Sequence, residues 1–417
     1  MSQPLILLIF LVLGFVGGLI LRAIGNPGLA AGSDYVVLVG EIWLRALQMT
    51  SLPLLIALLI TGIAGAGDVA ASGRIAGRSL KWIILLVAGA ILIGSAVTLA
   101  FIAIWPVAPV AREALVAGLG AVGGSPASPP PPLREWLVNV IPTNPFAATA
   151  SGAILSMVIF VMLFALAITR LPPERRAPLI AFFDAVNQAM MVMVGWVLKL
   201  APLGAFTLAL GVGLHGGAGA AGAIVQYVLL ECVAGAAIIL ALYPLTAIFG
   251  RISPLRFARA VAPPQIVAAS TQSSLASLPA MITAAEGQLD VPPRVAGVTL
   301  PIAVSIFKIT SATMNLAVVL FTAHVLGIEI SAGTLIAGMV VACLVSFGVA
   351  GLPGASSFFA SVVPIALAMG VPTTLLAILI AVEVIPDLFR TVGNVTADVA
   401  LTRIVAMRKG SREATAA

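Results

Sequence analysis

Long apolar runs separated by short polar segments follow one another along the whole chain. A transmembrane helix needs roughly 20 mostly apolar residues, and runs of about that length or more occupy residues 5–21, 36–66, 79–105, 135–169, 179–212 and 222–249. The first run has no basic stretch before it and no A-x-A-like site, so we interpret it as a span rather than a cleaved signal. Less regular apolar segments follow at 256–286, 294–326, 332–368 and 372–407. The pattern predicts an all-α membrane protein.

Composition excludes several classes of protein. Of the 417 residues, 61% are hydrophobic and 9% are charged, whereas soluble domains carry about 25% charged residues. A soluble enzyme is therefore excluded, and the net charge of +6 is too scattered for nucleic-acid binding. Cys232 and Cys343 lie inside apolar runs, which argues against disulfides or a zinc site. Without a Walker A or H-E-x-x-H sequence, we expect neither enzyme activity nor a metal or other cofactor.

The cationic residues orient the spans, because cytoplasmic loops of membrane proteins are enriched in Lys and Arg. With a cytoplasmic N-terminus, 14 of the 21 cations fall in inner connections, three in outer connections and four within apolar segments. This asymmetry requires 256–286 and 332–368 each to enter and leave on one side, which makes them re-entrant hairpins. We therefore expect eight transmembrane helices, two hairpins and a cytoplasmic C-terminus. The inner cations are Arg74, Arg78, Lys81, Arg170, Arg175, Arg176, Arg251, Arg256, Arg259, Arg294, Arg403, Arg408, Lys409 and Arg412; the outer ones are Arg22, Arg112 and Arg134.

Small polar residues and turn formers interrupt both hairpins at their middle. The first reads Ser270-Thr-Gln-Ser-Ser-Leu-Ala-Ser-Leu-Pro279 and the second Gly348-Val-Ala-Gly-Leu-Pro-Gly-Ala-Ser-Ser357. Paired interruptions of this kind point to a transporter binding site near the bilayer midplane. The alternative is a pair of kinked helices packed through small residues. Two G-x-G-x-x-G matches, at 118–123 and 211–216, follow no predicted strand, so we interpret both as loops.

A polar stripe runs along the last apolar segment. Glu383, Asp387, Arg390, Asn394 and Asp398 lie within an arc of about 80° on a 3.6-residue helix. Each ionisable residue at the bilayer centre costs about 2.5–3.5 kcal/mol, so such residues face the bundle interior and carry function. Mutual neutralisation of Asp387 and Arg390 is the alternative, but it does not explain the other members of the stripe. The stripe therefore predicts a substrate site.

Two further charges lie inside apolar segments. Lys308 is 14 residues beyond Arg294 and 16 before His324, too deep to reach the membrane surface by snorkelling. It therefore needs a buried carboxylate partner or a neutral amine. Glu231 has no obvious partner in the sequence, so we interpret it as a protonated or proton-carrying carboxylate.

These features resemble the glutamate transporter homologues of the dicarboxylate/amino acid:cation symporter family over nearly the whole chain. The resemblance rests on Gly40-Glu-Ile-Trp-Leu-Arg-Ala-Leu-Gln-Met49, Ile141-Pro-Thr-Asn-Pro-Phe146, Thr299-Leu-Pro301, Gly351-Leu-Pro-Gly354 and Asp387-Leu-Phe-Arg-Thr-Val-Gly-Asn-Val-Thr-Ala-Asp398. It implies a fold built from inverted repeats and a homotrimer in the plasma membrane, here a bacterial inner membrane. It also implies transport by an elevator mechanism. The implied scaffold covers 1–78 and 106–212, the mobile transport domain covers 79–105 and 213–410, and 411–417 form a tail.

The resemblance also implies how substrate binds. Asp387 would bind a substrate ammonium and Arg390 a distal carboxylate, assisted by Thr391 and Asn394; this suits an acidic amino acid, because Arg offers a bidentate fork for carboxylates. The main-chain carboxylate would contact the two hairpin tips and the start of the seventh span. These contacts are Ser273, Ser274, Gly351, Pro353, Gly354 and Ser311.

The chain departs from the family at the positions that bind sodium. An Asn-Met-Asp-Gly-Thr signature is replaced by Phe307-Lys308-Ile309-Thr310-Ser311, and residues 83–93 carry no side-chain oxygen. We therefore hypothesise that the Lys308 ammonium replaces a bound cation and pairs with Asp398 or Asp387. Transport would then be independent of sodium. It would be either uncoupled, or proton-coupled if Lys308 or Glu231 changes protonation during the cycle.

Several alternatives stay open. Lys308 could be a structural counter-ion while sodium binds elsewhere through backbone carbonyls. Phe389 and Gln272 reshape the pocket relative to the family, which leaves a C4-dicarboxylate, a small neutral amino acid or a sulfonate as other substrates. An anion channel or a substrate sensor would also explain the polar hairpin tips.

Overall fold

The computed structural model describes residues 3–71, 73–119, 141–151, 154–348 and 354–407, and these form helices and turns without a strand. This confirms the all-α prediction. Within these residues, four helical segments are long and apolar enough to cross a membrane by length and composition: Arg74–Ile104, Pro173–Lys199, Gly219–Gly250 and Pro293–Leu326. The helices are α1 (Gln3–Ile24), α2 (Pro27–Ala71), α3 (Arg74–Ile104), α4 (Pro109–Leu119), α6 (Pro145–Ala150), α7 (Ile154–Thr169), α8 (Pro173–Lys199), α9 (Ala201–Gly211), η2 (Val212–Gly216), α10 (Gly219–Gly250), α11 (Pro254–Thr271), α12 (Leu278–Gln288), α13 (Pro293–Ile306), α14 (Ile309–Leu326), α15 (Ala332–Gly348), α16 (Gly354–Ala368), α17 (Leu376–Val382) and α18 (Val384–Ala406).

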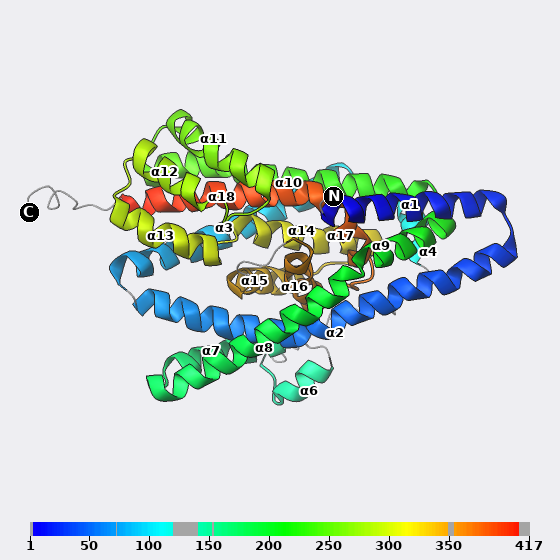
Figure 1. Cartoon of the computed structure of the whole chain (residues 1–417), viewed down its shortest axis with the longest axis horizontal. Coiled ribbons are helices and arrows are strands. Elements are labelled where there is room, and N and C mark those ends of the chain that lie inside the picture. Colours follow the sequence, from blue (N-terminus) through cyan, green and yellow to red (C-terminus); the bar gives the residue numbers. More distant parts are fainter. Residues whose placement is uncertain (1–2, 72, 120–140, 152–153, 349–353, 408–417) are drawn as a thin grey trace, which may run out of the picture.

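The helices pack in two sets (Figure 1). In one, α1 packs on α9, and α2 packs on α7, α8 and α9. In the other, α18 packs on α10, α11, α13 and α14, and α3 packs on α14. The helices α15 and α16 contact α14 on one side and α2 on the other. The polar stripe of α18 is thereby enclosed by the second set.

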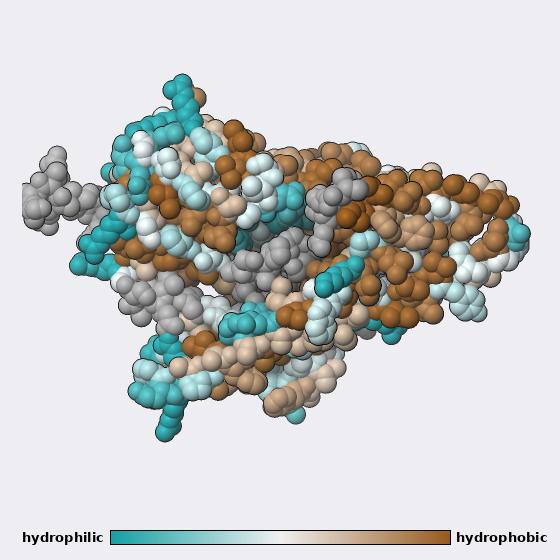
Figure 2. All heavy atoms as spheres, in the orientation of Figure 1, coloured by the Kyte–Doolittle hydropathy of each residue, from teal (hydrophilic) through white to brown (hydrophobic). Residues whose placement is uncertain are grey.

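Apolar and polar surfaces separate along the long axis (Figure 2). Apolar side chains dominate around α1 and the adjoining half of α2. Polar side chains gather at the opposite end of the molecule, over the start of α8, the start of α11 and the end of α12. Figure 1 places the α2–α3 and α7–α8 connections and the end of α18 at this same polar end. The cation-rich connections therefore share one side of the protein.

The predicted first hairpin is an antiparallel pair of helices. The helices α11 and α12 pack on each other, and residues 272–277 form the tip between them. Gln272 ends α11 in the left-handed region, with φ of 51°. At the base, Arg256 and Asp290 form an ion pair of 2.7 Å, and the Arg403 guanidinium of α18 donates to the carbonyls of Gly250 and Leu289. The second hairpin pairs α15 with α16, and its tip at 349–353 lies outside the described residues.

The segment 294–326, which the sequence predicts as a span, is not one regular helix. The segment breaks at Phe307 and Lys308, between α13 and α14. The break leaves unpaired backbone groups at both half-helix ends, and polar side chains satisfy two of them. The Lys308 Nζ donates to the Val304 carbonyl at 2.8 Å, and the Thr310 amide donates to Asn394 Oδ1 at 3.0 Å.

The last segment is also interrupted, where the sequence predicted a continuous span. The helix α17 ends at Val382, Glu383 lies at the junction, and α18 begins at Val384. Pro386 accounts for this, because proline has no amide hydrogen and its ring clashes with the carbonyl four residues earlier. Glu383 thereby lies at the entrance of α18, where a carboxylate interacts favourably with the helix dipole.

The interpretation of 211–216 as a loop is wrong as well. Gly211 ends α9, and residues 212–216 form the π-helical turn η2. A side chain on Gly213 would collide with the backbone carbonyl of Phe15 in α1. The glycines therefore serve close helix packing rather than a turn. Of the other match, Gly118 lies in α4 and residues 120–123 lie outside the described part.

Candidate functional site

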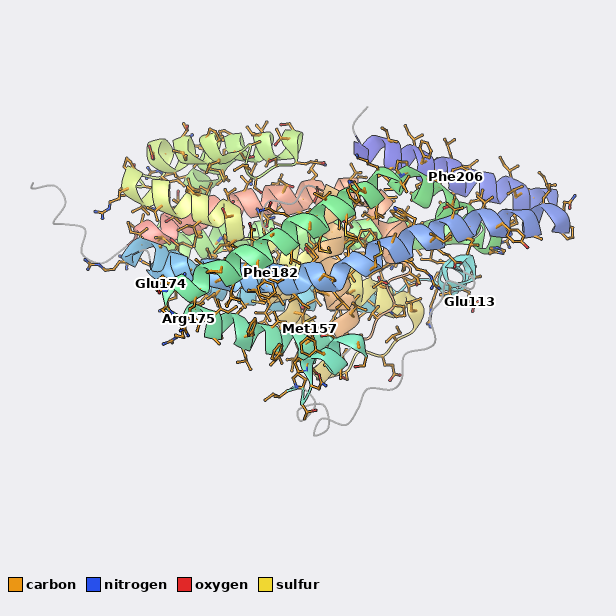
Figure 3. All side chains as sticks on the ribbon, turned by 60° about the horizontal axis from the view of Figure 1, so that its bottom comes forward. Glu113, Met157, Glu174, Arg175, Phe182 and Phe206 are labelled. Atoms are coloured by element: carbon orange, nitrogen blue, oxygen red, sulfur yellow. The ribbon has the colours of Figure 1, made fainter. Side chains whose placement is uncertain are left out.

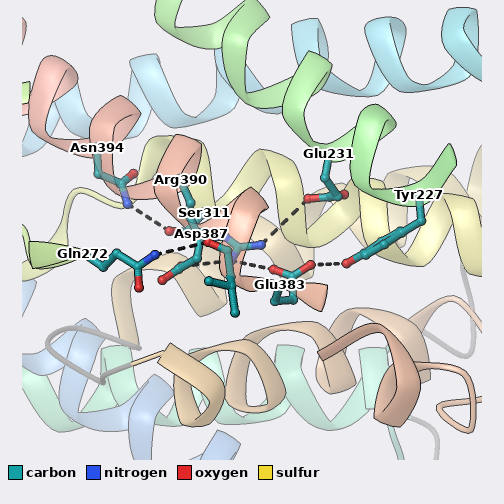
Figure 4. A network of polar contacts seen from close by, with 9 residues as sticks. Tyr227, Glu231, Gln272, Ser311, Glu383, Asp387, Arg390 and Asn394 are labelled. Carbon is teal, nitrogen blue, oxygen red and sulfur yellow. Dashed lines mark hydrogen bonds and ion pairs between the residues drawn. The ribbon is translucent and has the colours of Figure 1, made fainter. Parts of the chain in front are cut away.

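Arg390 is the centre of a buried charged cluster that three carboxylates share (Figure 4). Its Nη1 lies 2.8 Å from Glu383 Oε2 and 3.1 Å from Asp387 Oδ1, and its Nη2 lies 3.8 Å from Glu231 Oε2. We call these four residues, with Tyr227, the Arg390 cluster. The Arg390 side chain is 8% exposed and that of Asp387 is 21% exposed. Of the three acids, Asp387 is thus the most accessible.

Glu231 does have a partner, contrary to the expectation from the sequence. It lies on α10, is fully buried and faces the Arg390 guanidinium of α18. Glu231 and Arg390 meet because α10 packs against α18. The spacing of residues within one apolar segment does not reveal a contact of this kind.

Tyr227 is a member of the cluster that the sequence analysis did not identify. Its hydroxyl donates a hydrogen bond to Glu383 Oε1, and its side chain is fully buried. A signal was present, because Tyr227 precedes Glu231 by four residues, and residues four apart share one helix face. Glu383 was recognised only as part of the stripe, and the structure makes it the closest carboxylate to Arg390.

Lys308 lies at the break between α13 and α14, where its ammonium is held by the C-terminal end of α13. Besides the bond to the Val304 carbonyl, it interacts electrostatically with Asp398 of α18. Asp398 is fully buried, and neither of its carboxylate oxygens has a hydrogen-bond partner among the described residues. Of the two predicted partners, Asp398 is the one that interacts electrostatically with Lys308, while Asp387 pairs with Arg390.

Asn394 links the polar stripe to the start of α14. Its Oδ1 accepts from the Thr310 amide, and its Nδ2 donates to Ser311 Oγ at 3.0 Å. The structure thus brings together Asn394 and Ser311, both predicted site residues. The buried Thr391 is also on α18, next to Arg390.

The tip of the first hairpin reaches the same region. The Gln272 side chain donates to the Val384 carbonyl at 3.2 Å, which places the tip beside the start of α18. Ser273 and Ser274, both predicted contacts, follow in this tip and are half-buried. Of the predicted contacts in the second tip, Gly351 and Pro353 lie outside the described residues; Gly354 begins α16.

The chain is similar to known membrane transporters over almost its full length. A sequence profile described as the sodium:dicarboxylate symporter family matches residues 5–408. A proton/sodium-glutamate symport protein of Bacillus subtilis is 30% identical, over 95% of this chain and 90% of the relative. A C4-dicarboxylate transport protein of Azorhizobium caulinodans is 27% identical, over 89% and 82%. The human neutral amino acid transporter B(0) is 28% identical, over 94% and 78%.

The profile match and the match to the glutamate symporter of Bacillus subtilis each extend over more than nine-tenths of the chain. The chain therefore belongs to the sodium:dicarboxylate symporter family, and it is a membrane transporter rather than an enzyme.

Proposed function

We propose that this protein is a secondary active transporter that carries an acidic amino acid, aspartate or glutamate, across the plasma membrane without sodium. The observation that carries the proposal is the Lys308 ammonium, which donates to the Val304 carbonyl at the helix break and interacts electrostatically with the buried Asp398. Carbonyl oxygens at a half-helix C-terminus, together with a carboxylate, are the groups that hold coupling cations in transporters with broken helices. A tethered ammonium at this place makes a bound sodium ion unnecessary.

The Arg390 cluster supports an acidic amino acid as the substrate. Arg390 Nε and Nη2 are buried and have no hydrogen-bond partner among the described residues, so both can donate to a substrate carboxylate. The partly exposed Asp387 carboxylate suits the substrate ammonium. The glutamate symporter of Bacillus subtilis is named for such a substrate. Other relatives are named as a C4-dicarboxylate transporter and a neutral amino acid transporter. The test below therefore includes a dicarboxylate and a neutral amino acid as alternative substrates.

We further propose that the protein works as an elevator, with the scaffold in residues 1–78 and 106–212 and the transport domain in residues 79–105 and 213–410. In support, the Trp43 indole of α2 donates to the Val197 carbonyl of α8 at 2.9 Å, within the proposed scaffold. The Arg390 cluster and Lys308 both lie within the proposed transport domain. Both termini would lie in the cytoplasm of a bacterial cell.

A homotrimer is proposed from the family resemblance, and the surface of α8 supports contact with another subunit or lipid. In the most apolar 18-residue stretch of α8, only 6% of the residues are buried within the chain. Phe182 is 60% exposed and Trp196 is 63% exposed, and Figure 3 shows Phe182 along α8, beyond Glu174 and Arg175 at its start. Exposed aromatic side chains of this size need an apolar neighbour.

The substrate is tested first by thermal stabilisation of the purified protein. We expect aspartate or glutamate to raise the melting temperature, and malate and serine to have smaller effects, because only an acidic amino acid supplies partners for both Asp387 and Arg390. Labelled aspartate should then accumulate in proteoliposomes loaded with unlabelled aspartate. If only malate or only serine stabilises the protein, the substrate is a dicarboxylate or a neutral amino acid instead. A current without aspartate uptake would favour an anion channel over a transporter.

A further inference from the structure

Three carboxylates face one guanidinium in the Arg390 cluster, so its charges do not balance. With Glu231, Glu383 and Asp387 all ionised, the cluster carries a net charge of −2 around a nearly buried arginine. Uncompensated buried charge destabilises a folded protein. A substrate carboxylate beside Arg390 would raise this net charge to −3 unless one of the three acids binds a proton.

The contacts of the three acids differ, and they single out Glu231. Glu383 pairs with Arg390 at 2.8 Å and accepts the Tyr227 hydrogen bond. Asp387 pairs at 3.1 Å and is partly exposed to solvent. Glu231 is fully buried, 3.8 Å from Arg390 Nη2, and neither oxygen has a hydrogen-bond partner among the described residues. Within the cluster, Arg390 alone therefore stabilises the charged form of Glu231.

The surroundings of Glu231 contain few other ionisable groups. Arg390 faces it from α18, Glu383 from the start of that helix, and Tyr227 and Cys232 lie on its own helix. The other elements that pack on α10 are α3, α4, α11, α14, α17 and η2. In the described part of the chain, none of them is found to bring a charged group that acts on Glu231. The protonation of Glu231 is thus tied to what Arg390 and Glu383 contact.

We propose that Glu231 binds a proton together with the anionic substrate, by competing with the substrate carboxylate for Arg390. A proton from the water on the open side of the site binds the Glu231 carboxylate and weakens its attraction for Arg390 Nη2. The substrate carboxylate then accepts from Nη2 and Nε in its place. The proton removes one negative charge and the carboxylate restores it, so the cluster stays at −2 throughout. This inference rests on the proposed function, because it needs an anionic substrate.

The test measures aspartate binding to the purified full-length protein by calorimetry, from mildly acidic to mildly alkaline pH. Because one proton is taken up with each aspartate, wild-type affinity should fall as pH rises, by up to about tenfold per pH unit. Glu231→Gln is neutral at every pH, so its affinity should be independent of pH and equal to the wild-type affinity in acid. Glu286→Gln, which removes an exposed carboxylate on α12, should keep the wild-type dependence.

Proton uptake by the wild-type protein gives a second readout that needs no variant. Calorimetry in buffers of different ionisation enthalpy should show about one proton bound per aspartate at alkaline pH. Binding without proton uptake, or the same pH dependence in Glu231→Gln as in the wild type, would overturn the inference alone. Should Glu231→Gln not fold, the proton count decides. Failure of the wild type to bind aspartate or glutamate at any pH would instead overturn the proposed function, and the inference with it.

Discussion

Replacing Lys308 with methionine is expected to abolish aspartate uptake and to lower the stability of the protein. The substitution nearly keeps the length of the side chain and removes the ammonium that interacts electrostatically with the buried Asp398. Removing one partner of a buried charge pair destabilises proteins by roughly 3–5 kcal/mol, because the remaining charge is left uncompensated. Thermal unfolding in detergent and uptake into proteoliposomes measure the two effects.

A second substitution separates the pairing from a general defect. In the Lys308→Met, Asp398→Asn double variant no uncompensated charge remains, so we expect the melting temperature to recover much of the loss. Lys199→Met, at the exposed end of α8, is the control for removal of a lysine and should leave stability unchanged. A fully stable and active Lys308→Met protein, or a double variant less stable than the single one, would exclude the pairing of Lys308 with Asp398.

Replacing Arg390 with lysine should weaken aspartate binding about 10- to 100-fold while the protein stays folded. Lysine keeps the positive charge among the three carboxylates but lacks the planar fork with which arginine binds a carboxylate at two points. A hydrogen bond to a charged group contributes about 1.5–3 kcal/mol, which corresponds to this loss of affinity. Titration of the purified variant with aspartate measures the effect.

Arg294→Lys is the matched control, because Arg294 is exposed at the start of α13. It should bind aspartate like the wild type. Arg390→Lys should bind serine no more weakly than the wild type does, since serine has no distal carboxylate. Equal aspartate affinity in Arg390→Lys and the wild type would place the distal carboxylate elsewhere in the site.

Helical periodicity made part of the site predictable. The positions of Asp387, Arg390 and Asn394 follow from the 3.6-residue turn of a single helix. The structure shows the ion pair of Asp387 with Arg390, which the sequence analysis gave as the alternative to a substrate site. The first hairpin could be recognised from its sequence because turn formers break its apolar run. Its tip at 272–277 falls within the predicted interruption.

Contacts between helices could not be predicted from the sequence patterns. The sequence of α10 alone does not indicate that Glu231 faces Arg390, because that contact depends on how α10 and α18 pack. The break at Lys308 was also missed, because residues 294–326 are apolar enough to resemble one continuous helix. The Lys308 and Asn394 side chains stabilise the break by bonding to the freed backbone groups, and this is visible only in three dimensions.

The central claim is that the Lys308 ammonium takes the place of a bound sodium ion. Uptake of labelled aspartate into proteoliposomes, with all sodium replaced by choline, tests it most directly. The account predicts the same initial rate and the same accumulation in both salts. Collapse of uptake in choline, with recovery when sodium is restored, would contradict it.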